Sequence, residues 1–193
     1  MSGIYHGTKF GFVQSSVDDQ MGIALEGRLA NASDINLCDG ISAGENIPVG
    51  YGVKLGALSG ALKAGINDQK VVLPESTDDA TAFAGIVVRT ETGHTDANGL
   101  NYVALQEIAT LLRATRVGGR IWVKAQSNIT KAGGVHWVID DDTVNELTAG
   151  GFAGSAVSNK TVALPNVKVI AEATKGNLAL VELTGDPINI SAS

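Results

Sequence analysis

The sequence predicts an all-β protein, a β-sandwich or jelly-roll-like barrel of about eight to ten short strands with little helix. Glycine is abundant, at 24 of 193 residues, and aromatic residues make up only 5%. This composition is typical of many short strands joined by tight turns. Apolar residues also alternate with a period of two in several short runs, without the strand–helix–strand order of α/β proteins.

The domain organisation predicted from the sequence is an N-terminal arm, residues 1–20, followed by a single β domain, residues 21–193. The arm shows no sustained period but carries Tyr5, Phe10 and Phe12, three of the seven Phe and Tyr residues (four Phe and three Tyr). Such a segment is either a frayed terminus or an extension that reaches a neighbouring subunit.

Alternating apolar residues locate the strands of the β domain. We expect strands at 21–30, 47–56, 70–73, 83–90, 135–140, 167–174 and 178–184, and a further pair within 110–125. The stretches 31–46 and 141–160 are interpreted as long connections, and 101–109 as a short helix or irregular segment. The turn Lys175-Gly176-Asn177 predicts a hairpin between the last two strands.

The segment 110–125 is predicted to form a hairpin that turns at Gly118-Gly119, because glycine adopts the positive φ angles of tight turns. In its second strand, alternation places Trp122 on the same face as Arg120 and Lys124. A large apolar side chain on a charged face either packs beneath a neighbouring loop or contacts another molecule.

Charge and composition exclude several classes of function. The net charge is −6 and the 14 Lys and Arg residues are scattered, whereas nucleic-acid-binding proteins concentrate basic residues. We therefore expect no direct contact with nucleic acid. No apolar run approaches the ~20 residues of a membrane-spanning helix, so no membrane partner is expected. The single cysteine, Cys38, excludes an intrachain disulfide and fits assembly in a reducing compartment.

No catalytic, cofactor-binding or metal-binding residues are predicted. His6, His94 and His136 are not spaced as a metal-binding pair. The chain has no Gly-x-Ser-x-Gly motif, and the glycine-rich segment 150–154 lacks the lysine of a phosphate-binding loop. The acidic run Asp140–Asp142 could ligate a cation such as Ca²⁺ or form a solvated turn. The turn is favoured because the EF-hand spacing is missing.

Four segments of the chain resemble the head decoration, or structural cement, proteins of tailed bacteriophages. They are IPVGYGVKLG at 47–56, KVVLPESTDDATAFAGIVVRT at 70–90, GGRIWVKA at 118–125 and GNLALVELTG at 176–185. Their order and spacing are similar to the plan of that family, and the resemblance covers roughly residues 21–185. The arm and the stretch 101–108 fall outside it.

The resemblance implies a non-enzymatic virion protein that binds the outer surface of the capsid and needs no cofactor. It would join neighbouring subunits of the major capsid protein, stabilise the DNA-filled head, form a homodimer or homotrimer, and assemble in the host bacterial cytoplasm. Tyr5, Phe10, Phe12 and Trp122 are the candidate subunit or capsid contacts. A carbohydrate-binding module and a tail or baseplate module of a phage particle are the alternatives.

Overall fold

A computed structural model describes residues 25–30, 37–56, 69–90, 94–97, 99–113 and 119–184. Within these ranges the chain is nearly all β, with fourteen strands and one short 3-10 helix, η1 (Ala80–Ala82). The predicted all-β, barrel-like class is therefore confirmed. Tyr5, Phe10 and Phe12 lie outside the described residues.

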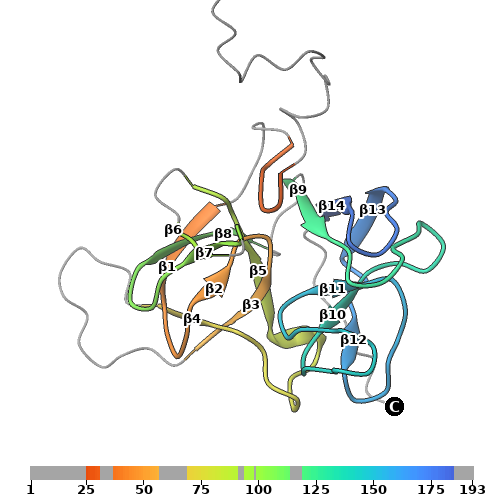
Figure 1. The fold of residues 1–193 in the computed structure, drawn as a ribbon, viewed down its shortest axis with the longest axis horizontal. Helices are drawn as coiled ribbons and strands as arrows, with labels where there is room; N and C mark the ends of the chain where they lie inside the picture. Colours follow the sequence, from red (N-terminus) through yellow and green to blue (C-terminus); the bar gives the residue numbers. More distant parts are fainter. Residues whose placement is uncertain are drawn as a thin grey trace, which may run out of the picture.

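A closed five-stranded barrel occupies the left half of Figure 1. Its strands, in neighbour order, are β1 (Leu37–Ser42), β4 (Lys70–Val72), β3 (Gly52–Leu55), β5 (Phe83–Val87) and β8 (Ile108–Arg113). Strands β1 and β4 run parallel, and the other neighbours are antiparallel. Closure pairs the backbone of each strand on both sides, which removes the exposed edges of an open sheet.

Three small sheets complete the described fold. The first has the order β13 (Val167–Ala171), β14 (Leu178–Leu183), β9 (Gly119–Lys124); the second β11 (Phe152–Ala153), β10 (His136–Val138), β12 (Thr161–Ala163); the third β2 (Ile47–Pro48), β7 (Asn101–Val103), β6 (His94–Thr95). The first two lie to the right of the barrel in Figure 1, and the third lies with the barrel on the left.

Strands β5 and β8 form a wall shared by two hydrophobic cores. Val87 and Leu111 belong to the core of the barrel, whereas Ile86 and Leu112 belong to the larger core beneath the sheets on the right. Successive residues of a strand point to opposite faces, so the same two strands seal both cores. The two cores therefore lie on opposite faces of the same strand pair.

Several segments differ from their predicted structure. The connection predicted at 141–160 contains β11, the single strand predicted at 47–56 is divided between β2 and β3, and the described residues 25–30 form a turn and one β-bridge. Residues 31–46, expected to be a connection, contain β1. Gly40 interrupts the apolar alternation of β1. The barrel interior has no space for a side chain at this position, because an added Cβ would lie 2.3 Å from Val71 Cγ2. Residues 101–109, expected to be a short helix or irregular, form β7 and the start of β8. The turn at Gln106 (φ 67°) separates β7 from β8. The apolar residues of the two strands therefore do not share one alternation, which explains why their spacing resembles that of a helix.

The hairpin predicted over 110–125 is wrong. Strand β8 pairs with β1 and β5, and β9 pairs with β14, so the two strands lie in different sheets. Both edges of β8 are already used within the barrel, which leaves no edge for β9. Gly119 instead allows close packing, because a Cβ there would lie 2.4 Å from Leu112 Cδ1. The hairpin at Lys175-Gly176-Asn177 is confirmed, with Gly176 at φ 84°.

Candidate interaction surface around Trp122

Trp122 lies on the outer face of the sheet formed by β13, β14 and β9. Register places it directly opposite Leu180 of β14. On the other side of β9, the amide of Trp122 donates to the carbonyl of Arg28 at 3.0 Å, within the segment 25–30 that lies beside β9 in Figure 1. Leu29 packs against the core, so alternation directs Arg28 outward. We call Arg28, Trp122 and Leu180 the Trp122 face.

Charged residues border the Trp122 face. Alternation along β9 places Arg120 and Lys124 on the side of Trp122, as the sequence predicts, while the intervening Ile121 and Val123 are buried. Arg120 Nε donates to Glu182 Oε1 at 3.1 Å. The Arg120 side chain is 43% exposed, so solvent screens this ion pair and it contributes little to stability. Its more evident effect is to place charged groups beside the apolar side chains of Trp122 and Leu180.

The indole nitrogen of Trp122 is buried and has no hydrogen-bond partner among the described residues, although the residue as a whole is partly exposed. A buried donor without an acceptor costs about 1–3 kcal/mol. Rotamer changes of interface side chains are common on binding, and a rotation that met an acceptor on another molecule would remove this cost. Tryptophan is also enriched among the residues that dominate binding energy. Trp122 therefore presents part of its ring on the outer face of the sheet and has an indole donor without an acceptor among the described residues.

A cleft of about 390 Å³ lies next to the Trp122 face. Its charged lining residues are Glu26, Arg89, Asp96 and Lys124. Burial raises the pKa of the Glu26 carboxyl above its ordinary value of 4.5, while the nearby charges of Lys124 and Arg89 oppose this shift. Arg89 Nε also donates to the Glu26 carbonyl at 3.3 Å, which attaches the segment 25–30 to the end of β5.

Glu26→Gln is expected to raise the free energy of unfolding at neutral pH. A carboxyl group with a higher pKa in the folded state binds its proton more tightly when folded. The contribution of Glu26 to the free energy of unfolding is therefore fully present below its unfolded pKa of 4.5. It is lost as the pH rises through the raised pKa of the folded state. Glutamine carries no charge at neutral pH, so the variant does not lose this stability. Urea unfolding at about pH 4 and about pH 7 measures the effect.

The control for this prediction is Glu45→Gln, which changes an exposed carboxylate outside the cleft. We expect the gain from Glu26→Gln to be clear at neutral pH and small in acid, and the control to show no such pattern. A lower stability of Glu26→Gln at neutral pH would contradict the prediction and show that attraction to Lys124 and Arg89 outweighs burial.

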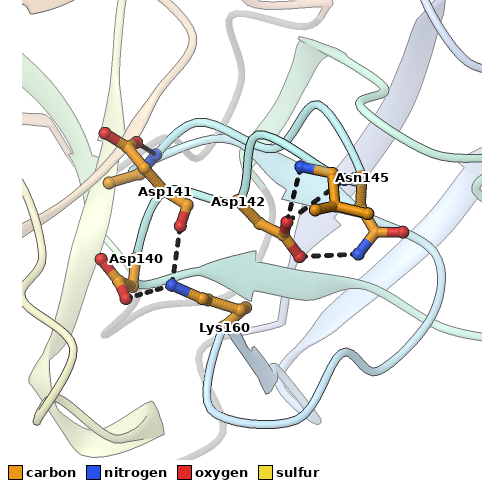
Figure 2. Close-up of polar contacts among 7 residues, drawn as sticks. Asp140, Asp141, Asp142, Asn145 and Lys160 are labelled. Carbon is orange, nitrogen blue, oxygen red and sulfur yellow. Dashed lines mark hydrogen bonds and ion pairs between the residues drawn. The ribbon is translucent and has the colours of Figure 1, made fainter.

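The acidic run Asp140–Asp142 forms a hydrogen-bonded turn (Figure 2). Lys160 Nζ lies 2.5 Å from Asp140 Oδ2 and 2.7 Å from the Asp141 carbonyl oxygen. Asp142 accepts hydrogen bonds from the backbone and side-chain nitrogens of Asn145, at 3.2 and 2.6 Å. The positive charge beside the run is thus Lys160. In the part of the chain that the structure describes, no three His, Cys, Asp or Glu side chains gather as metal ligands.

A larger cleft, of about 740 Å³, lies where the barrel meets the loop before η1. Lys54 in this cleft forms ion pairs with Asp78 at 2.7 Å and with Glu75 at 3.5 Å. The two described histidines lie in separate sheets: His94 contacts Glu107 at 2.9 Å, and burial lowers the pKa of His136. Lys54 and His94 are thus held by nearby carboxylates, and His136 is partly buried in its sheet.

The fold is similar to that of a chain in a solved phage capsid structure. A chain from "The capsid of Myoviridae Phage XM1" superposes with a TM-score of 0.60 at 17% identity, over 90% of this chain and 96% of that chain. The family model for the structural cement protein (E217 gp24/Pam3 gp6) matches residues 13–184. The chain therefore belongs to the phage structural cement family, which confirms the resemblance seen in the sequence. Its role is structural, as a component of the phage virion.

The head fiber gp8.5 N base of bacteriophage phi29 aligns with a TM-score of 0.44 at 10% identity, over 81% of this chain and 99% of that chain. No curated protein gave a significant match. No helix in the described ranges is long and apolar enough to cross a membrane.

The structure brings Trp122 together with residues that sequence reasoning did not select. Arg28 and Leu180 come from distant parts of the chain, and only the pairing of β9 on both of its edges places them beside Trp122. The available sequence signal was the apolar residue between two cations, and it identified the centre of the surface.

Proposed function

We propose that the protein binds the outer surface of the phage capsid and joins neighbouring subunits of the major capsid protein, which stabilises the DNA-filled head. Membership of the structural cement family supports this role. The observation that carries the contact itself is Trp122, a partly exposed tryptophan with an unmatched donor on an outer sheet face. Weak contacts of this kind, repeated over a lattice, give high avidity.

The arm is the second proposed contact. Tyr5, Phe10 and Phe12 provide aromatic side chains of the type that anchor interfaces, and we propose that they lie at contacts between subunits of a homodimer or homotrimer. The net charge of −6 disfavours contact with packaged DNA, which supports the outer surface. Assembly in the host cytoplasm fits the single cysteine.

Co-sedimentation with expanded capsids that lack the protein tests this function. We expect saturable binding, and electron microscopy of the decorated particles is expected to show added density that bridges adjacent major capsid subunits. DNA-filled heads without the protein should release their DNA at a lower temperature. Binding to isolated tails but not to capsids would contradict the proposal and favour a tail module.

A further inference from the structure

A second apolar surface lies on the barrel, in the other half of the molecule from the Trp122 face. Ile108, at the start of β8, is 64% exposed, and Leu105 in the preceding turn is 45% exposed. Register pairs Ile108 with Ile41 of β1, so their side chains project to the same side. Ile41 and Leu105 also line a groove of about 390 Å³ together with Lys70. We call Ile41, Leu105 and Ile108 the barrel patch.

Hydrogen bonds hold the barrel patch in a defined geometry. The amide of Leu105 donates to Asn46 Oδ1 at 3.0 Å, and the amide of Gln106 donates to the carbonyl of Ser42 at 3.0 Å. The Ser42 hydroxyl donates to the carbonyl of Ala104. The turn is thus fixed to β1 with its aliphatic side chain outward. Isolated exposed apolar residues are ordinary, but a contiguous group with a polar rim marks an interaction site.

We propose that the barrel patch binds the N-terminal arm, residues 1–20, of a second copy of this chain. Ile108 and Leu105 are exposed in the single chain, so they are accessible to a segment of another molecule. The arm lies outside the described residues, and twenty extended residues span up to about 65 Å, enough to reach a neighbour. It carries three aromatic side chains for the groove, and its Asp18-Asp19 pair complements the charge of Lys70.

This inference deepens the proposed function and rests on it for its biological setting. A cement protein needs at least two separate contacts, and the chain carries apolar surfaces on its two halves. The Trp122 face would contact the capsid, while the arm and the barrel patch would link one copy to the next. Each link formed on the lattice acts at high effective concentration, so a weak arm contact suffices.

Photo-crosslinking tests the pairing directly. The full-length protein with Leu105→p-benzoylphenylalanine is prepared in ¹⁵N-labelled and unlabelled forms, mixed, and irradiated both free in solution and bound to capsids. We expect mass spectrometry to find heavy–light pairs that join position 105 to a peptide within residues 1–20. Links confined to single chains, links to a capsid protein, links to another copy's barrel, or no links would each overturn the proposal.

A double-mutant comparison supplies an independent readout. Leu105→Ser with Ile108→Ser should weaken self-association at least about tenfold in sedimentation equilibrium, as should Phe10→Ser with Phe12→Ser, and their combination should add little because both remove one contact. The matched control is Val144→Ser, at a residue 89% exposed outside the patch, and it should change nothing. Additive effects would overturn the pairing. Failure of the wild type to bind capsids would instead defeat the proposed function, because self-association is measured separately.

Discussion

Replacing Trp137 by alanine is expected to lower the free energy of unfolding by about 4 kcal/mol. Trp137 of β10 is fully buried and packs edge-on against Phe83, with ring centroids 5.3 Å apart. Its indole nitrogen donates to the carbonyl of Gly52 in β3 at 3.1 Å. One side chain therefore fills the larger core and also connects it to the barrel. Alanine leaves a cavity and an unpaired carbonyl, so both terms act in the same direction.

Urea unfolding followed by circular dichroism measures this loss. Trp137→Phe retains most of the ring volume but removes the donor to Gly52, so we expect an intermediate loss of about 1–2 kcal/mol. The expected order of stability is wild type, then Trp137→Phe, then Trp137→Ala. A loss below about 1 kcal/mol for alanine would show that the core collapses around the site and that Trp137 does not hold the two halves together.

Trp122→Ala is expected to weaken capsid binding by about 30-fold per site, which corresponds to about 2 kcal/mol, the size typical of an interface hot spot. Trp122 is partly exposed on an outer sheet face, so its removal should cost the monomer much less stability than the loss of Trp137. Its buried donor lacks an acceptor among the described residues. Truncation therefore removes no internal hydrogen bond described in the structure.

Co-sedimentation at several protein concentrations measures the affinity, and urea unfolding of the same samples measures stability. Trp122→Phe keeps an aromatic surface without the donor and is expected to bind with intermediate affinity. Val144→Ala is the matched control for loss of an exposed apolar side chain. Unchanged capsid binding, or a stability loss of about 3 kcal/mol or more, would assign Trp122 to internal packing and remove it from the interface.

Strands with a clear local pattern were predictable from the sequence. The hairpin of β13 and β14 follows from alternation on both sides of Lys175-Gly176-Asn177, and Gly176 adopts the positive φ that such a turn requires. Strand β1 was not predictable, because Gly40 meets Val71 inside the barrel and interrupts the apolar alternation. Apolar alternation therefore reveals a strand only where burial alone selects its residues. Where a neighbouring element leaves no room for a side chain, as at Gly40, glycine interrupts the alternation.

The Trp122 face was likewise predictable in part from local alternation and in part only from strand pairing. Alternation in β9 placed Trp122 beside Arg120 and Lys124 without any structure, and register confirms this arrangement. The same segment also led to a wrong hairpin, because adjacency in sequence does not reveal that β8 already has two partners in the barrel. Leu180 reaches the surface only through the pairing of β9 with β14.

The sequence by itself determined the all-β class, the faces of individual strands and the resemblance to phage structural cement proteins, because these depend on residues that are close in the chain. Only the tertiary structure decided which strands pair and which core each face enters. It also decided which apolar residues stay exposed, and so located the Trp122 face and the barrel patch. Barrel closure and burial depend on contacts between distant segments, and these long-range pairings leave no local pattern in the sequence.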